Sequence, residues 1–243
     1  MKYGSITTGI IADGLVFNID AANRASTIPS TSTSTAFNTV DTSVSGSFIN
    51  DTFYDSSTIT PSYAFDGAED YINIGAGLCN VFGSSYNGSI TVSSWINTDT
   101  TSGNDGIFQL GNLGNIYGFL NIHTAANYLY IHTSTTNNTS KNQARSGNIS
   151  SIANNWTNIT VIWDLSNSSN SKVYMNGALL SLDQDSFATG TANLTGEFSS
   201  IGAYYSTTTV FDGNIGPIQI YNRALSANEV LHNYNALKGR FGL

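Results

Sequence analysis

The chain has 243 residues, with 8 Lys and Arg against 16 Asp and Glu, so its formal net charge is −8 at pH 7. A chain this acidic lacks the basic footprint of a nucleic-acid-binding protein, and no apolar run reaches the roughly 18 to 20 residues that cross a bilayer. Its 13 Tyr, 12 Phe and 3 Trp can build a packed core, although Ser, Thr and Asn make up more than a third of the residues. We therefore expect one globular domain over 1–243, without nucleic-acid or membrane partners.

Short apolar–polar alternations, interrupted by Gly, Asn and Ser, are typical of β-strands and dominate the chain. After an N-terminal arm at 1–14, a first strand is predicted at Leu15–Asp20, and the Ser/Thr-rich segment 25–40 is expected to be a surface loop. The other predicted strands are Tyr63–Phe65, Tyr71–Ile74, Ile90–Asn97, Gly106–Leu110, Ile116–His123, Tyr128–Thr133, Thr157–Asp164, Lys172–Met175, Ser199–Ala203 and Ile215–Asn222. Asn176-Gly177 predicts a type I′ turn, because both residues tolerate positive φ.

One helix is predicted, near the C-terminus. Ser226 and Glu229 have the spacing of a capping box, in which each side chain bonds the backbone amide of the other. An apolar stripe follows, so we expect a helix over 226–238 that packs on a sheet, and then a tail at 239–243.

Six separated segments carry a further pattern, and Trp95 and Trp163 within them are expected to point into the core. The segments are Phe65–Ile74, Ser89–Ile96, Trp156–Asp164, Val173–Gly177, Ser200–Ala203 and Phe211–Ser226. In this order they resemble the laminin-G-like domains of the concanavalin A-like lectin/glucanase superfamily. The resemblance implies an all-β fold, a concanavalin A-like jelly-roll sandwich of two antiparallel sheets with one short C-terminal helix.

The two flanks, Gly14–Ala21 and Asn235–Phe241, are similar to laminin-G-like modules in virion proteins of tailed bacteriophages, marine ones in particular. This resemblance implies a structural protein of the virion surface, assembled in the host cytoplasm, where a chain with the single cysteine Cys79 needs no disulfide. Its partners would be other virion proteins of the capsid or a fibre, and a homo-oligomer is expected. Two placements stay open: a capsid decoration or head-fibre protein first, and a receptor-binding lectin of a tail or fibre as the alternative.

The C-terminal tail and the arm at 1–14 are the candidate assembly contacts. In the tail, Lys238 and Arg240 place positive charge beside the ring of Phe241.

No catalytic constellation is recognisable, so we expect no enzyme. Glycoside hydrolases use two carboxylates about 5–9 Å apart, but glutamate occurs only at 69, 197 and 229, and Glu229 is better explained as a helix cap. His123, His132 and His232 have no neighbouring Ser/Asp or Cys arrangement that suggests a triad.

Calcium is a disfavoured alternative, and no cofactor is expected. Asp183-Gln184-Asp185 resembles the acidic stretch of pentraxins, and this resemblance would imply a Ca²⁺ site. The stretch does not lie, however, where the acidic loop of that family lies in the chain. In that family the acidic loop follows the strand that corresponds here to 201–203, and the segment 204–209 contains no carboxylate for a hard cation.

Glycan binding has a candidate surface on the hairpin of the strands 116–123 and 128–133. Alternation places Leu120, Ile122, Leu129 and Ile131 on the core face. The opposite face carries aromatic rings, amides and imidazoles that could stack on sugars of a host surface: Tyr117, Phe119, Asn121, His123, Tyr128, Tyr130 and His132. Tyr204 and Tyr205 form a second candidate. The alternative is that this face packs against a loop or a neighbouring subunit.

Overall fold

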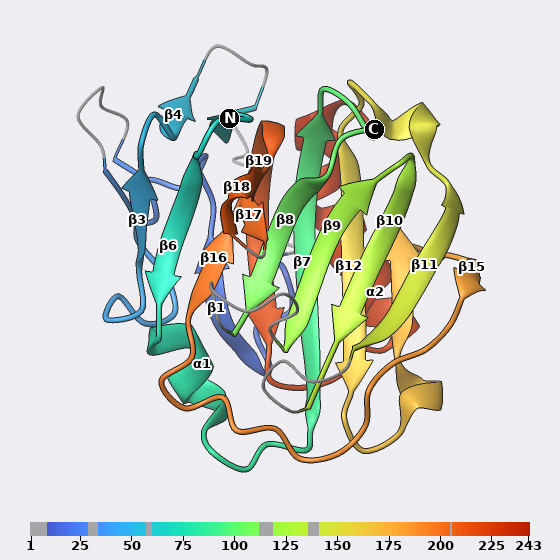
Figure 1. Ribbon diagram of the computed structural model, residues 1–243. Helices are drawn as coiled ribbons and strands as arrows, with labels where there is room; N and C mark the ends of the chain where they lie inside the picture. Colours follow the sequence, from blue (N-terminus) through green and yellow to red (C-terminus); the bar gives the residue numbers. More distant parts are fainter. Residues whose placement is uncertain (1–8, 29–33, 57–59, 112–118, 136–140, 205) are drawn as a thin grey trace, which may run out of the picture.

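The computed structural model describes residues 9–28, 34–56, 60–111, 119–135, 141–204 and 206–243. Its strands form two antiparallel sheets stacked face to face, which we name the front and back sheets after their places in Figure 1. The predicted all-β jelly-roll sandwich with one short C-terminal helix is confirmed.

The back sheet is centred on two ten-residue strands, β7 and β19. Its strand order is β14 (Ala178–Leu179), β13 (Lys172–Met175), β12 (Thr157–Asp164), β7 (Ser89–Thr98), β19 (Asp212–Tyr221), β5 (Ser62–Asp66) and β4 (Phe53–Asp55). A further strand, β1 (Leu15–Ile19), pairs with the end of β19 that β5 leaves open.

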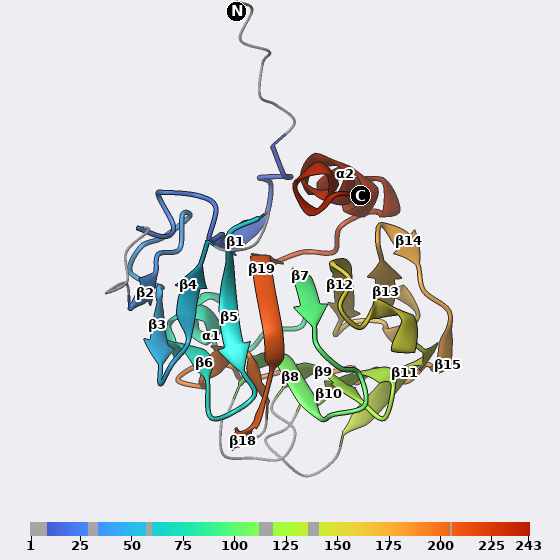
Figure 2. The ribbon, with the colours of Figure 1, turned by 90° about the horizontal axis from the view of Figure 1, so that it is seen from above.

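The front sheet has the order β15 (Leu182–Gln184), β11 (Asn142–Asn148), β10 (Tyr128–Thr133), β9 (Leu120–Ala125), β8 (Asp105–Leu110), β16 (Ser199–Ile201), β6 (Tyr71–Gly75), β3 (Gly46–Ile49) and β2 (Thr35–Ala36). A separate hairpin of β17 (Ala203–Tyr204) and β18 (Ser206–Val210) follows β16. Figure 2 shows this hairpin on the outer side of the front sheet.

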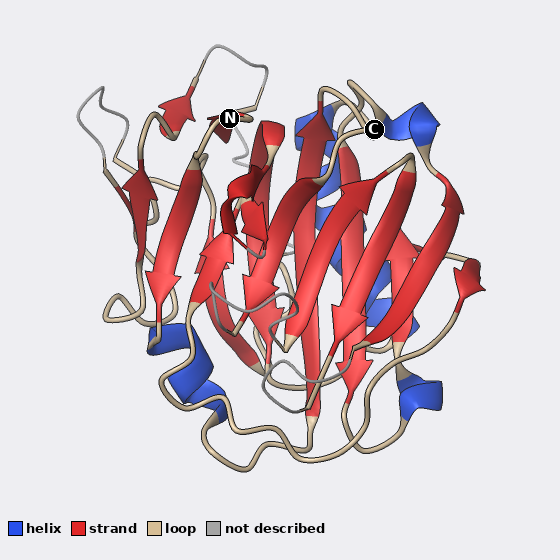
Figure 3. Ribbon diagram, viewed as in Figure 1, coloured by secondary structure: helices blue, strands red, loops and turns tan. Residues whose placement is uncertain are grey.

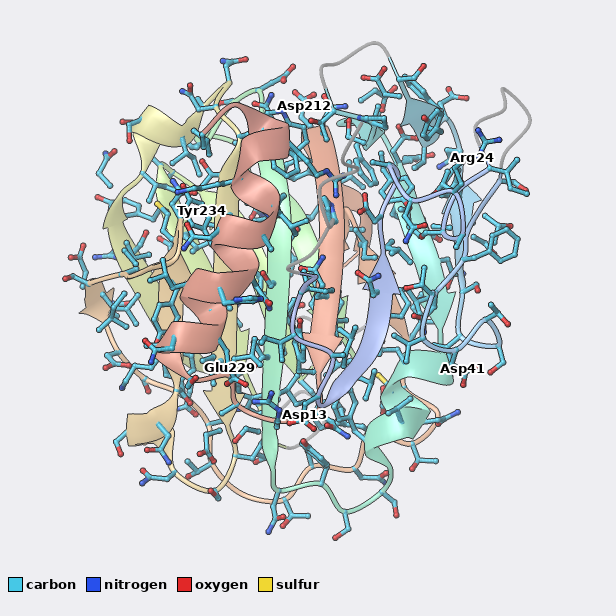
Figure 4. All side chains as sticks on the ribbon, turned by 180° about the vertical axis from the view of Figure 1, so that it is seen from behind. Asp13, Arg24, Asp41, Asp212, Glu229 and Tyr234 are labelled. Carbon is cyan, nitrogen blue, oxygen red and sulfur yellow. The ribbon has the colours of Figure 1, made fainter. Side chains whose placement is uncertain are left out.

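The helices lie outside the two sheets, as Figure 3 shows by colour. The α-helices are α1 (Gly77–Phe82) and α2 (Ala227–Leu237), and the 3₁₀ turns are η1 (Ser150–Ile152), η2 (Ser168–Asn170) and η3 (Lys238–Phe241). The capping box predicted at the start of α2 is present, with Ser226 and Glu229 each bonding the backbone amide of the other. Figure 4 shows α2 running across the outer face of the back sheet.

The main core fills the space between the sheets, and the ring of Trp163 is fully buried in it, as predicted. Trp95 does not point there. The residues of β7 in phase with Ile90, Val92 and Ile96 face the core, so Trp95, out of phase with them, lies on the outer face under the C-terminal segment. The expectation that both tryptophans enter the inter-sheet core is therefore wrong for Trp95.

The Ser/Thr-rich segment 25–40 is not simply a surface loop. Thr35–Ala36 form β2, and Ser26, Thr27 and Asn38 are buried. Their polar groups are satisfied inside the chain: Ser26 Oγ donates to Phe37 O at 2.7 Å, and Thr27 Oγ1 lies 2.8 Å from Tyr63 Oη. Buried polar groups are normally hydrogen-bonded, as these are. Because the buried side chains of this segment are polar, the sequence shows no apolar alternation that would reveal their burial.

Candidate functional site

The outer face of the front sheet carries a row of polar residues that crosses seven strands. Residues paired directly across neighbouring strands share one face of a sheet. The paired row is Gln143, His132, Asn121, Gln109, Ser200, Asn73 and Ser47, on β11, β10, β9, β8, β16, β6 and β3. The adjacent row through Ile131, Ile122 and Phe108 belongs to the buried core, so the polar row faces away from it.

The same face carries five rings that we call the aromatic strip: His132, which belongs to the row, and Tyr128, Tyr130, His123 and Tyr204 beside it. The imidazole of His123 is stacked between two tyrosines, with centroid distances of 5.3 Å to Tyr130 and 4.1 Å to Tyr204. His132 meets His123 edge-on at 4.7 Å, and Tyr128 meets Tyr130 edge-on at 6.3 Å. The geometry is that of offset and T-shaped aromatic pairs, which stabilise one another.

The hairpin β17–β18 brings Tyr204 into the aromatic strip. It folds over β8 at Gly106, where a Cβ would lie 2.4 Å from the backbone nitrogen of Tyr204, so only glycine permits this approach. Tyr204 was expected to form a second candidate site, but it belongs to the same one. Tyr117 and Tyr205 lie outside the described residues.

The aromatic strip is only partly accessible. Asn121 is fully buried, His123 and His132 are each 3% exposed, and Tyr204 is 8% exposed. Tyr128 and Tyr130 are half-buried at the end of the strip nearest β11. In this conformation the two tyrosines are open to a ligand on the surface, whereas Asn121 and the two histidines, which were also predicted to contact a sugar, are buried. The ring of Tyr204, stacked at 4.1 Å, covers the imidazole of His123.

Burial keeps both histidines neutral. Burial and the nearby charge of Lys141 lower the pKa of His132 to about 4, although a hydrogen bond to Gln143 opposes the shift. Burial, His132 and Lys141 hold the pKa of His123 well below its ordinary value. At neutral pH the strip is therefore an uncharged aromatic surface.

Amides and a guanidinium border the exposed end of the strip. His132 Nε2 lies 3.0 Å from Gln143 Oε1, and Gln143 Nε2 donates to Gln184 Oε1 at 2.6 Å. The guanidinium carbon of Arg145 lies 4.6 Å from the centroid of the Tyr128 ring, a cation–π distance. These groups can donate and accept hydrogen bonds around any molecule placed on the tyrosines.

The acidic stretch 183–185 borders this same edge. Asp183 Oδ2 lies 3.5 Å from Arg145 Nη2, and Asp185 is exposed. Over the part of the chain that the structure describes, no three His, Cys, Asp or Glu side chains gather closely enough to hold a metal ion.

The expected assembly contacts in the C-terminal tail are engaged within the chain. Phe241 is buried and its ring stacks on Trp95 at 4.1 Å. Arg240 binds Asp20 through two nitrogens, at 2.7 and 2.8 Å, and its carbonyl accepts from Thr60 Oγ1. Lys238 lies over the ring of Tyr234 at 5.4 Å. These contacts hold the tail on its own back sheet, with the ring of Phe241 buried within the chain.

Two other side chains that often take part in catalysis, a carboxylate and a thiol, have structural roles in this protein. Glu229 caps α2 and binds Arg223 at 2.7 Å, and the guanidinium lowers the pKa of that carboxyl to about 2. Cys79 is fully buried 3.1 Å from Ser199 Oγ, and burial raises the pKa of its thiol to about 11, as suits an inert core residue. Among the described helices, none combines the length and apolar character needed to cross a membrane.

The comparison with protein families agrees with this architecture. Residues 65–231, more than half of the chain, match the family model described as concanavalin A-like lectin/glucanases superfamily. The chain belongs to this superfamily. No curated protein sequence matches it.

Solved structures with the superfamily fold include the receptor-binding domains of botulinum neurotoxins. A structure of type C neurotoxin, whose cell entry depends on two ganglioside molecules, is 15% identical, with a TM-score of 0.62 over 92% of this chain and 51% of that chain. The binding domain of neurotoxin DC in complex with SialylT is 13% identical, with a TM-score of 0.64 over 93% of this chain and 52% of that one. The same domain in complex with rat synaptotagmin II is 14% identical, with a TM-score of 0.64 over 92% and 52%. This superfamily member therefore spans about half the length of these structures, and the likeness shows the fold.

Proposed function

We propose that this protein is a non-enzymatic surface protein that binds glycans at Tyr128 and Tyr130. The observation that carries the proposal is the pair of half-exposed tyrosines on the outer face of the front sheet, supported by the buried stack of His123 and Tyr204. Small-molecule sites typically combine aromatic walls with a few well-placed polar groups. The faces of sugar rings are apolar and their edges carry hydroxyls, so such a surface suits them.

The polar neighbours of the two rings complete the proposed site. Gln143 and Gln184 present amides, which can both donate and accept hydrogen bonds, and Arg145 presents only donors. Because His132 holds Gln143 and Gln143 holds Gln184, these side chains are already positioned before a ligand arrives. Preorganisation of this kind lowers the entropic cost of binding.

The absence of catalysis is part of the proposal. Glu229, one of three glutamates, is committed to the cap of α2 and to Arg223. Figure 2 shows α2 on the side of the sandwich opposite the front sheet. The neurotoxin domains of similar fold are described as binding gangliosides and SialylT, which supports a binding role by analogy alone.

Affinity electrophoresis in gels that contain bacterial cell-surface polysaccharides tests this proposal. We expect the protein to be retarded, while the same polysaccharides in solution release no reducing ends. Release of reducing ends that grows with time would contradict the non-enzymatic role, and a mobility unchanged across the polysaccharides would contradict glycan binding.

We further propose that the glycan-binding surface belongs to the virion of a tailed bacteriophage, as a capsid decoration or head-fibre protein assembled in the host cytoplasm. The similarity of the flanks Gly14–Ala21 and Asn235–Phe241 to phage virion modules supports this placement. A receptor-binding lectin of the tail is the alternative. Immunogold electron microscopy of purified particles separates the two: we expect gold over the head, gold confined to the tail would favour the receptor-binding role, and unlabelled particles would contradict a virion protein.

A further inference from the structure

Arg145 is a half-buried arginine whose guanidinium makes no hydrogen bond with any described residue. Its one ionic contact is the 3.5 Å approach of Nη2 to Asp183 Oδ2, and its Nε is buried without a hydrogen-bond partner among the described residues. Arg240, by contrast, holds Asp20 through two nitrogens at 2.7 and 2.8 Å. Arg223 holds Glu229 in the same two-nitrogen manner, at 3.1 and 2.7 Å. Since buried polar groups and arginine–carboxylate pairs are normally bonded at such distances, Arg145 has donor capacity that the described residues do not use.

The fold places this guanidinium beside the proposed glycan site. Arg145 is paired with Tyr130 in the sheet register, and the register shifts between Tyr128 and Tyr130. The guanidinium lies over the Tyr128 ring, 4.6 Å from its centroid. The cation–π contact fixes the direction of the planar group next to both half-exposed rings.

The positive charge beside the aromatic strip is opposite in sign to the net charge of the whole molecule. The chain carries 8 Lys and Arg and a net charge of −8, which at long range repels an anionic polymer. Lys141 and Arg145 nevertheless lie along the same edge of the aromatic strip, with Lys141 Nζ 3.3 Å from His132 Nε2. Asp183, whose side chain is 49% exposed, is the carboxylate paired with Arg145.

We infer that the glycan bound at Tyr128 and Tyr130 is acidic, with a sugar carboxylate that Arg145 binds. The inference rests on the proposed function of this surface. A guanidinium fork matches a planar carboxylate through two parallel hydrogen bonds, which neither a lysine nor an amide reproduces. The ligand carboxylate takes the position beside Arg145 that Asp183 only approaches, so Asp183 is a competitor for the same donors.

Two substitutions of opposite expected effect test this, with polygalacturonate and its carboxyl-reduced neutral form as probes. We expect wild-type protein to bind polygalacturonate more tightly than the neutral polymer. Arg145→Gln should weaken polygalacturonate binding about 10-fold and neutral-polymer binding far less, because only the acidic polymer offers Arg145 a carboxylate. Asp183→Asn should strengthen polygalacturonate binding a few-fold, a gain that structural damage does not produce.

The possible outcomes distinguish failure of the acidic-glycan inference from failure of glycan binding itself. Equal binding of the two polymers by wild-type protein, or equal losses for both polymers in Arg145→Gln, would overturn the carboxylate while leaving glycan binding in place. Binding of dextran sulfate as tight and as dependent on Arg145 would also overturn it, because charge alone would then explain the affinity. Binding of neither polymer by wild-type protein would overturn the inference, and the proposed function would fall with it only if no other polysaccharide retards the protein.

Discussion

Replacing Trp95 by alanine is expected to lower the free energy of unfolding by about 3–5 kcal/mol, the usual cost of truncating a large buried aromatic ring. Trp95 is fully buried, yet it lies outside the inter-sheet core. Its ring stacks on Phe241 at 4.1 Å and on Tyr234 at 5.6 Å, with interplanar angles of 12° and 10°. It therefore joins the back sheet to α2 and to the C-terminal turn.

The loss should be accompanied by local release of the C-terminal segment. Without Trp95, the tail keeps the bonds of Arg240 to Asp20 but loses the ring on which Phe241 rests. Urea unfolding gives the global change, and amide hydrogen exchange should show the largest loss of protection over 227–243. Trp95→Phe is the matched control and should recover part of the loss. A change below about 1 kcal/mol in Trp95→Ala would contradict this packing.

Local signals predicted the elements that depend on neighbouring residues in the chain. The capping box of Ser226 and Glu229 identified α2, because both partners lie within one turn. The turn at Asn176 and Gly177 has φ of 52° and 76°, as its residue types require. The strands at 128–133, 157–164 and 172–175 were predicted with the observed bounds, since their alternation is clear.

Features that depend on distant segments were missed. The strand β11 has the polar sequence NQARSGN, and no apolar alternation reveals that Ala144 faces the core while Gln143 and Arg145 face outwards. Only its pairing with β10 shows that β11 supplies residues to the candidate site. Trp95 was assigned to the wrong face, although its phase relative to Ile90, Val92 and Ile96 was the signal that could have placed it.

The aromatic strip was predicted in part. Alternation correctly placed Tyr128, Tyr130, His123 and His132 on one face, because period two is a property of the strand itself. The stacking of Tyr204 on His123 was not predictable, since it depends on the return of the β17–β18 hairpin across Gly106. That contact covers His123, which is 3% exposed.

Loss of the two accessible rings is the second large effect we expect. Truncation of an aromatic residue at the centre of a binding surface typically costs about 2 kcal/mol or more, which is about a 30-fold loss of affinity. Tyr128→Ala with Tyr130→Ala should therefore weaken polysaccharide binding more than about 100-fold, a loss that makes it undetectable in most assays. Tyr130→Phe keeps the ring that stacks on His123 and should retain most of the affinity.

The most direct test of the account is the affinity of this double variant for the polysaccharide that retards the wild-type protein. Phe53→Ala removes a ring that is 54% exposed on β4 of the other sheet, and it serves as the control for unspecific loss of aromatic surface. Circular dichroism and thermal unfolding of all three proteins show whether the sandwich is intact. If the glycan binds at Tyr128 and Tyr130, the double variant loses binding while Phe53→Ala binds as the wild-type protein does. Wild-type affinity in a folded double variant would contradict binding at these two residues.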